Sequence, residues 1–297
     1  MATTGEFRYI DPSSFTTKPW AKVDTDAARS YEQTTRRRSV TDIRPLADTF
    51  GTDVSGFALH RSPAQEKAFT DDKAVRTGYY AEVEALLREK LPGISKVVIF
   101  DHTIRKHDKT SPRQPVQSVH VDQTPGAAAA RMRRHIEDAE EAEALLKGRY
   151  QIINVWRPIG HAATDFPLAL VDWRSTTREE LIAVDLLYPS RNEPGGDDRG
   201  KEVLPDPESV LSTEGYEVRG ETYGVAPSDK HKFYYVKDME PEEALFIKCF
   251  DSWSEWQEGG KQGLAALTPH TAFIDPQTPE GAKGRESIEV RCLVFYE

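Results

Sequence analysis

A histidine and an aspartate alternate with valines in the stretch SVHVDQTP, residues 118–125. Successive side chains of an extended chain point to opposite faces, so His120 and Asp122 share one face while Val119 and Val121 share the other. Two histidines and one carboxylate form the ligand set of non-haem Fe(II) sites, which leave the remaining metal positions open for substrate and oxygen. One strand can supply two of these ligands, and the third must come from a remote segment.

The third ligand has to be one of the other histidines. We favour His270, which stands in LTPHTAF at the start of a strand-like segment, 150 residues after His120. We therefore predict that His120, Asp122 and His270 are the metal ligands and the catalytic centre. The alternative for His270 is a histidine in a capped turn after Pro269. The remaining candidates are His60, His102, His107, His135, His161 and His231.

A second polar face follows in the stretch RESIEVR, residues 285–291. Alternation places Arg285, Ser287, Glu289 and Arg291 on one side of this strand and apolar residues on the other. A guanidinium can bind a carboxylate with two parallel hydrogen bonds, and a nearby hydroxyl adds one more donor. This pair suits the far carboxylate of 2-oxoglutarate, whose 1-carboxylate and 2-keto oxygens would chelate the metal. Arg285 and Arg291 lie about 20 Å apart along a strand, so they cannot hold the same end of so small a molecule.

A further arginine stands within an apolar run, in NVWRP. Alternation places Arg157 on the face of Val155, and Asn154 and Trp156 on the opposite face. A guanidinium in such surroundings needs an anion. We expect Arg157 to bind a ligand carboxylate from substrate or cosubstrate, and an ion pair with a protein carboxylate is the alternative.

The elements that must position these residues are two early helices and many short strands. We expect helices over 74–93 and 124–149, where apolar residues recur at helical spacing or strong helix formers dominate. Strand-like runs separated by turn residues then predict an all-β sandwich or barrel with flanking helices. These runs are 94–105, 150–159, 168–173, 181–188, 231–239, 243–250, 271–276 and 287–296.

The chain is predicted to be a single domain, 1–297. We expect residues 1–73 to form an N-terminal arm and extensions, with 1–40 wrapping the body. Residues 94–297 would form the core, with the helix 124–149 inserted. The Pro-, Gly- and Asp/Glu-rich segment 190–215 is a candidate lid over the site.

Composition narrows the classes of function. The N-terminus lacks the basic and apolar regions of a secretory signal, and no run approaches the roughly 20 apolar residues of a membrane helix. We therefore expect a soluble, cytoplasmic protein without a membrane partner. A net charge of -10 disfavours nucleic acid as a partner. The 2 cysteines, Cys249 and Cys292, lie in apolar runs and are predicted to be buried free thiols. A small-molecule substrate and a possible homo-oligomer complete the expected partners.

Taken together, H-x-D, a distal histidine and R-x-S resemble the Fe(II)/2-oxoglutarate-dependent oxygenases with a double-stranded β-helix fold. More narrowly, INVWRPI, EALFIKCFDS, TPHTAFIDP and RESIEVRCLVFY are similar to the fungal gibberellin desaturase-like group, which includes AsaB-type hydroxylase/desaturases. The resemblance implies a jelly-roll, cupin-like core and a requirement for Fe(II), 2-oxoglutarate and O2. It favours Arg285 with Ser287 over Arg291 as the cosubstrate anchor, because R-x-S follows the distal histidine in these enzymes.

The implied activity is oxidation of an unactivated C–H bond in a secondary metabolite or an amino-acid-derived substrate. Hydroxylation, desaturation and oxidative ring closure are alternative outcomes, with succinate and CO2 as coproducts. A competing hypothesis is a non-catalytic barrel that binds a small molecule or holds Zn(II), but structural zinc needs four protein ligands and no fourth has suitable spacing. An S-adenosylmethionine methyltransferase would need a Gly-rich turn after an early strand, whereas LPGISKVVIF has its glycine before the strand.

Overall fold

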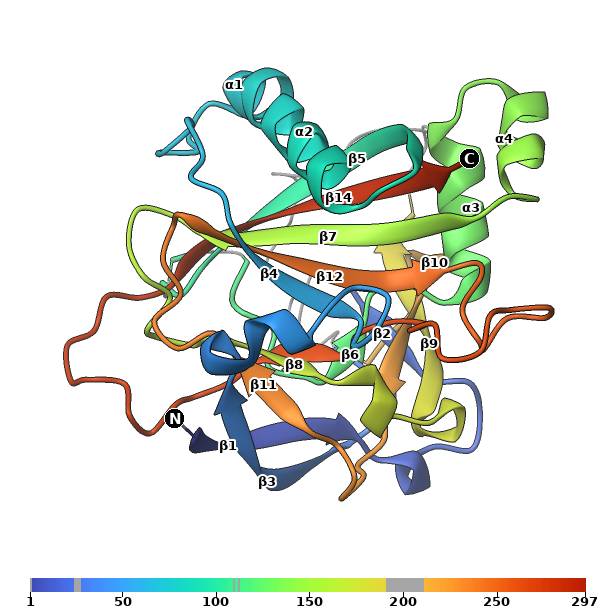
Figure 1. Cartoon of the computed structure of the whole chain (residues 1–297). Helices are drawn as coiled ribbons and strands as arrows, with labels where there is room; N and C mark the ends of the chain where they lie inside the picture. The colour runs from blue at the N-terminus through green and yellow to red at the C-terminus, as the bar shows by residue number, and fades with distance from the viewer. Residues whose placement is uncertain (1, 24–27, 109, 112, 191–210) are drawn as a thin grey trace.

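The chain folds into two β-sheets that enclose an apolar core, with helices on the outside (Figure 1). The structure is a computed structural model that describes all residues except 1, 24–27, 109, 112 and 191–210. The strands are β1 (Ala2–Ile10), β2 (Trp20–Lys22), β3 (Gln33–Asp42), β4 (Phe57–Arg61), β5 (Ile94–Lys106), β6 (His120–Val121), β7 (Tyr150–Pro158), β8 (Leu168–Val171), β9 (Leu181–Pro189), β10 (Tyr216–Val225), β11 (Phe233–Tyr235), β12 (Glu243–Asp251), β13 (His270–Ala272) and β14 (Glu286–Tyr296). The α-helices are α1 (Asp72–Ala74), α2 (Tyr80–Lys90), α3 (Pro125–His135) and α4 (Ala139–Leu145).

The five-stranded sheet is antiparallel throughout, in the order β4-β12-β7-β14-β5. Its central strand β7 is buried along its whole length, which explains its apolar composition. Ile152 and Trp156 point into the core between the two sheets, whereas Ile153 and Val155 point to the outer face. The sheet therefore has two apolar faces, and each face needs its own cover.

Helix α2 covers the outer face of this sheet (Figure 1). Val83, Leu86 and Leu87 are buried at helical spacing and pack in one cluster with Val155 and Val290 of β7 and β14. A short α1 and a π-helical segment, Val75–Tyr79, run into α2 without a break. The predicted helix 74–93 is thus present, with an irregular first turn.

The nine-stranded sheet carries the other half of the core, in the order β1-β3-β11-β8-β13-β6-β10-β9-β2. Leu168 and Leu170 face the five-stranded sheet, while Ala169 and Val171 join an aromatic cluster with Phe7 on the opposite face. β6 and β13 lie side by side in the middle of this sheet. Only the β3–β11 and β2–β9 pairs are parallel among the described strands, so the βαβ pattern of a methyltransferase is not what this part of the chain forms.

Several predictions of local structure need correction. Residues 1–40 are not an arm around the body, because β1, β2 and most of β3 are strands of the nine-stranded sheet. β4 likewise belongs to the five-stranded sheet, so the core begins well before residue 94. The predicted helix 124–149 is two helices, because Asp138 caps the N-terminus of α4 by accepting from the backbone of Glu140 and Glu141. The strand expected over 271–276 ends at Ala272.

Other expectations hold. Cys249 and Cys292 are both buried free thiols, as predicted. The mainly β architecture with flanking helices is confirmed. Most of the predicted lid 190–215 lies outside the described residues. Within the part of the chain that is described, no helix has the length and apolar character needed to cross a bilayer.

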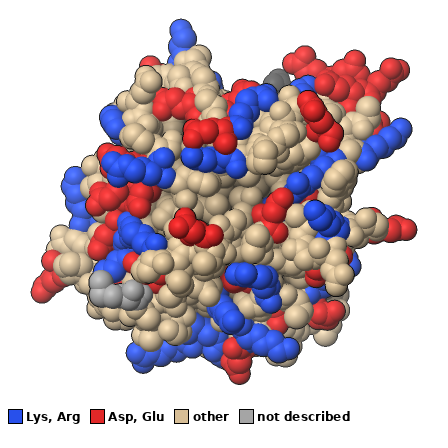
Figure 2. All heavy atoms as spheres, viewed as in Figure 1, with Lys and Arg blue, Asp and Glu red and all other residues tan. Residues whose placement is uncertain are grey.

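Charges of both signs are mixed over the face of the molecule shown in Figure 2. Acidic side chains gather at the upper right, where Figure 1 places α4 with Glu140 and Glu141 in its first turn. Basic side chains are more frequent along the lower edge, interrupted by acidic ones. This face therefore offers no continuous basic track, and the expectation about nucleic acid stays a prediction.

The packing of α2 predicts the cost of a core deletion. Leu87→Ala removes a fully buried side chain and should lower the free energy of unfolding by about 2–5 kcal/mol. Leu46→Ala is the matched control, because Leu46 is 44% exposed and should cost no more than about 0.5 kcal/mol. Denaturant midpoints measure both. Equal midpoints for the two variants would contradict the packing described here.

Candidate metal centre

His120 and His270 face each other across two paired strands. β6 and β13 are antiparallel, and the two histidines are direct partners in their register. Their ring centroids are 4.5 Å apart. Backbone pairing in the middle of the nine-stranded sheet thus brings together two imidazoles that are remote in the sequence.

Asp122 follows β6 and points to the same side as His120. Its Oδ1 atom lies 3.4 Å from Nε2 of His120 and 4.0 Å from Nε2 of His270. One ligand atom from each of these three residues lies within 4.8 Å of the other two. The structure therefore brings the three predicted ligands together at a single point, as the H-x-D alternation and the distal histidine require.

Backbone carbonyls hold both imidazoles in one orientation. Nδ1 of His120 is 2.7 Å from the carbonyl of Ser118, and Nδ1 of His270 is 3.0 Å from the carbonyl of Thr268. Each carbonyl fixes the proton on Nδ1 and leaves the lone pair of Nε2 toward the shared point. This is the usual arrangement of metal-binding histidines, whose second nitrogen donates to a carbonyl or carboxylate.

The protonation states suit a divalent cation. Burial, together with the nearby His120, lowers the pKa of His270 to about 4, so this ring is neutral near pH 7. Burial alone would raise the pKa of Asp122, but the hydrogen bond from His120 outweighs it and holds the pKa well below the usual range. Burial would lower the pKa of His120, but the contact with Asp122 outweighs it and raises that pKa, so a metal ion would take the place of a proton on this ring.

Asn154 supports the carboxylate from the opposite sheet. Its Nδ2 donates to Oδ2 of Asp122 at 2.7 Å, which leaves Oδ1 for the metal side. Asn154 is fully buried on β7 and points toward the inner face. Alternation in the sequence predicts that Asn154 shares a face with Trp156, but it indicates no role for this amide. A single amide among the apolar residues of the run IINVW was the signal that could have identified it.

The other histidines lie elsewhere. His102 contacts the hydroxyl of Tyr80, and His231 lies between Tyr9 and Glu180. Among the described residues, no fourth His, Cys, Asp or Glu joins the three at the centre. A structural zinc site closes with four protein ligands, so the donor set found here suits a catalytic metal with open positions better than the zinc-holding alternative.

Arg285 is a buried cation whose guanidinium has no carboxylate partner among the described residues. It is 2% exposed; its Nη1 donates to the carbonyl of Phe166 at 2.6 Å, and its guanidinium lies 5.5 Å above the ring of Trp156. Nε has no partner among the described residues. Burial, with a smaller effect from Arg105, lowers the pKa of Arg285 to about 9. A buried charge left in this state is suited to receiving an anion.

The backbone around Arg285 is held on both sides. Asp165 accepts from the backbone N–H of Arg285 at 3.2 Å and contacts Nδ1 of His107. The N–H of His107 donates to the carbonyl of Arg285 at 2.7 Å. Gly284 allows this approach, because a Cβ there would lie 2.3 Å from the carbonyl oxygen of His107. His107, a rejected ligand candidate, thus helps to place the predicted anchor.

The two arginines of the R-x-S strand have different surroundings. Arg291 forms a two-point ion pair with Asp101, at 2.6 and 2.8 Å. Arg285 has no such partner among the described residues, and its role as the anchor stays a prediction. Ser287 is buried on the same face of β14, two residues from Arg285.

Glu289 is a further polar residue of this face, to which the sequence pattern assigned no role. It is partly exposed on the inner side of β14 and forms no hydrogen bond or ion pair with any described residue. Burial raises the pKa of Glu289 to about 7, and the charge of Asp122 adds to the effect. Its carboxyl group is therefore partly protonated near neutral pH.

Arg157 lies away from this centre. It is 2% exposed, and its guanidinium donates to the hydroxyl of Tyr79 and to the carbonyls of Ser62 and Pro241. These partners belong to the outer side of the five-stranded sheet, opposite Trp156. The structure does not bring Arg157 together with the other predicted site residues, because strand alternation turns it to the opposite face.

The comparisons with known proteins agree with this geometry. Residues 7–295 match a family model described as an oxidoreductase/YMDC permease-like domain. The chain is 32% identical to the hydroxylase/desaturase EfuI of Hormonema carpetanum, over 87% of this chain and 83% of the relative. It is 31% identical to the Fe(II)/2-oxoglutarate-dependent dioxygenase NvfI of Aspergillus novofumigatus, over 86% and 81%. This chain belongs to the Fe(II)/2-oxoglutarate-dependent oxygenases.

The fold of this oxygenase matches its relatives along the whole chain. The solved structure of the iron and alpha-ketoglutarate-dependent endoperoxidase NvfI superposes with a TM-score of 0.76 and 26% identity, covering 99% of this chain and 98% of that one. The jelly-roll core is thereby confirmed, as is the resemblance to fungal hydroxylase/desaturases. Fe(II), 2-oxoglutarate and O2 are the reactants of this family, and the His-Asp-His donor set fits the metal.

Glu289 predicts a pH dependence of stability. Because its folded pKa is raised from about 4.5 to about 7, the folded protein holds this proton more tightly, and stability falls as pH rises between those values. Glu289→Gln removes this effect. In metal-free protein, the stability of the variant relative to the unchanged chain should rise by about 2 kcal/mol from pH 5 to pH 8.

Denaturant unfolding at the two pH values measures this difference. Glu286→Gln is the control, because Glu286 lies on the same strand in an ion pair with Lys106. Parallel pH curves for Glu289→Gln and the unchanged chain would show that the carboxyl group is not perturbed.

Proposed function

We propose that this oxygenase holds Fe(II) through His120, Asp122 and His270 and oxidises an unactivated C–H bond of a small secondary metabolite or amino-acid-derived substrate. The observation that carries the proposal is the convergence of the three ligand atoms within 4.8 Å, with both Nε2 atoms directed inward. No further protein ligand is present at this point among the described residues, so coordination positions are left for other molecules.

Iron with 2-oxoglutarate and O2 supplies an oxidant able to take hydrogen from an unactivated C–H bond, with succinate and CO2 as coproducts. The protein's own contribution is to place the substrate and exclude side reactions. Asn154 keeps the Asp122 carboxylate turned with Oδ1 toward the metal, and the carbonyls of Ser118 and Thr268 keep the imidazoles from rotating. Whether hydroxylation, desaturation or ring closure follows depends on where the pocket holds the target bond.

Arg285 and Ser287 would bind the far carboxylate of 2-oxoglutarate. The support is the unpaired Nε of a buried guanidinium, together with a buried hydroxyl on the same strand face. A carboxylate placed there would complete the hydrogen bonds of Arg285 and return its pKa toward the usual value. Trp156 lies beneath the guanidinium and limits its movement.

Location and partners stay predictions from the sequence: a cytoplasmic location, a possible homo-oligomer, and no nucleic-acid or membrane partner. Arg157 is left out of the proposed site, since its guanidinium is bound by the protein on the far face of the sheet.

Removal of the carboxylate ligand tests the iron site. Asp122→Ala should lower metal affinity and succinate formation at least about 100-fold, because even residues that only support metal ligands cost 10–100-fold. Metal content and succinate release measure the effect. Asp229→Ala is the control, since its side chain is 95% exposed and forms a surface ion pair with Arg38. Unchanged succinate formation in Asp122→Ala would refute the ligand assignment.

Removal of the guanidinium tests the anchor. Arg285→Met should weaken 2-oxoglutarate binding by about 2–5 kcal/mol, measured as loss of the weak visible absorption of the anaerobic Fe(II)–2-oxoglutarate protein. Arg285→Lys should be intermediate, because it keeps the charge but loses the two-point fork. Without 2-oxoglutarate, Arg285→Met should melt no lower than the unchanged chain, since it removes an uncompensated buried charge. Unaltered cosubstrate affinity would move the anchor elsewhere.

A further inference from the structure

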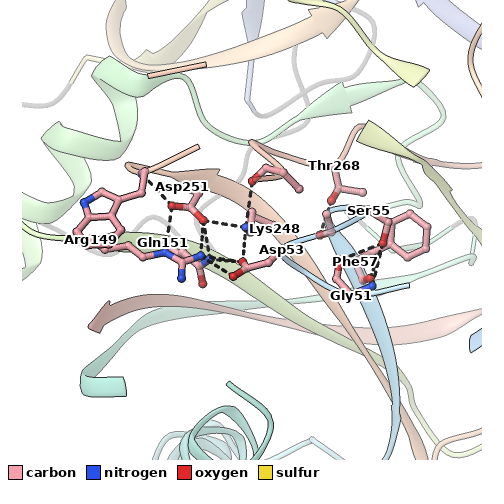
Figure 3. Close-up of polar contacts among 12 residues, drawn as sticks. Gly51, Asp53, Ser55, Phe57, Arg149, Gln151, Lys248, Asp251 and Thr268 are labelled. Carbon is pink, nitrogen blue, oxygen red and sulfur yellow. Dashed lines mark hydrogen bonds and ion pairs between the residues drawn. The ribbon is translucent and has the colours of Figure 1, made fainter. Parts of the chain in front are cut away.

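A cluster of charged side chains lies beside the segment that leads to His270 (Figure 3). Lys248 and Asp251 are fully buried, whereas Asp53 is partly exposed. Lys248 is completely buried in β12, and its Nζ atom donates to Asp53 at 2.7 Å, to Asp251 at 2.8 Å and to the carbonyl of Ala265 at 3.0 Å. All three protons of the ammonium group therefore have an acceptor. Lysine is rarely buried to this degree, so its presence within EALFIKCF needs a reason.

The charges of this cluster balance. Arg149 donates to Asp53 and Asp251, and Gln151 donates to the same two carboxylates (Figure 3). Burial would raise the pKa of Asp53, but Lys248 and Arg149 outweigh it and lower the pKa to about 2. The pKa of Asp251 is lowered by the same two cations despite its burial. Two cations and two carboxylates thus stay ionised and give a net charge of zero.

The cluster forms hydrogen bonds with both backbone groups of Ala265. The carbonyl of Ala265 accepts from Lys248, and the N–H of Ala265 donates to the carbonyl of Asp53 at 3.0 Å. Ala265–Thr268, which we call the strap, then leads directly to His270. The strap is buried, and its position is set by hydrogen bonds from this cluster rather than by a strand ladder.

The far end of the strap is fixed at Gly56. The carbonyl of Gly56 accepts from the backbone N–H of Lys248 at 2.8 Å and from Oγ1 of Thr268 at 2.6 Å. The carbonyl of Thr268 in turn accepts from Nδ1 of His270 at 3.0 Å. Gly56 has φ of +92°, and a Cβ there would lie 2.4 Å from Oγ1 of Thr268, so only glycine permits this contact.

We propose that Lys248 is a positioning residue for the metal centre: with Asp53 and Asp251 it holds the strap and thereby fixes the direction of the His270 imidazole. This inference rests on the proposed role of His270 as an iron ligand. Stability alone gives a weaker reason for the cluster, because apolar residues of similar volume replace buried ion pairs with little loss or a gain of stability. Apolar residues could fill the same volume, but they could not form directional hydrogen bonds to the strap.

The test is metal affinity in the full-length chain without turnover. Lys248→Met/Asp251→Asn removes one charge of each sign and leaves Arg149 paired with Asp53, so the variant stays neutral. Anaerobic titration with Co(II) should show about tenfold weaker binding, in the range found when outer partners of metal ligands are lost. The visible Co(II) spectrum should change as well, because the imidazole direction changes. Leu87→Ala, destabilised on the far side of the sheet, should bind Co(II) within twofold of the unchanged chain.

A double-mutant cycle tests whether the Lys248 cluster affects metal binding through the strap. Thr268→Val removes only the hydroxyl that ties the strap to Gly56 and leaves every charge in place, so it also serves if the first variant does not fold. It should weaken Co(II) binding by itself. Combined with Lys248→Met/Asp251→Asn, it should add less than its separate effect, because both act through the strap.

The outcomes separate this inference from the proposed function. If His270→Ala binds Co(II) as tightly as the unchanged chain, the ligand assignment is wrong and the inference falls with it. If His270→Ala loses the metal but Thr268→Val and the folded Lys248 variant keep full affinity and an unchanged spectrum, only the positioning role is overturned. If the losses of Co(II) affinity in the two variants add fully when they are combined, the strap does not connect the Lys248 cluster to His270.

Discussion

The register between β6 and β13 is the constraint on which the site depends. His120 and His270 oppose each other only in this register, and a slip of one residue would turn one imidazole to the other face of the sheet. These strands are only two and three residues long, so their own ladder cannot define the register. The neighbours on either side, β8 and β10, must define it instead. Catalytic geometry is thus a property of the whole sheet.

Sequence patterns predicted the residues of the centre because alternation in a strand is a local rule. The H-x-D pair, the polar face of β14 and the two-faced β7 all follow from side chains that point alternately up and down. The same rule failed for β1 and β3. The run TTRRRSVTD within β3 has little apolar content because much of one face is exposed, so nothing in it favoured a strand over an arm. The break before α4 was missed because a run of strong helix formers continues past the cap at Asp138.

Contacts between remote residues could not be predicted in this way. Arg285 and Arg291 are the same residue type on one face of one strand, and their difference comes from Asp101 on β5, which pairs with Arg291 alone. Lys248 and Asp53 also meet only in the folded chain, 195 positions apart. In both cases the identity of the partner decides the role of the charge, and the partner is set by tertiary packing rather than by spacing.

The charged groups in and beside the core are therefore of two kinds. Lys248, Arg149, Asp53 and Asp251 satisfy one another, so their charges cancel and their hydrogen bonds hold the backbone still. Arg285 and Glu289 have no such compensation from the residues that the structure describes, and burial moves the pKa of each toward its neutral form. An unpaired buried charge lowers stability, and a fold retains one where a bound molecule completes it. The satisfied cluster bonds the backbone at Ala265 that leads to His270, and the unsatisfied residues lie on the inner face of β14. The groups that position the site are thus distinct from those suited to bind its reactants.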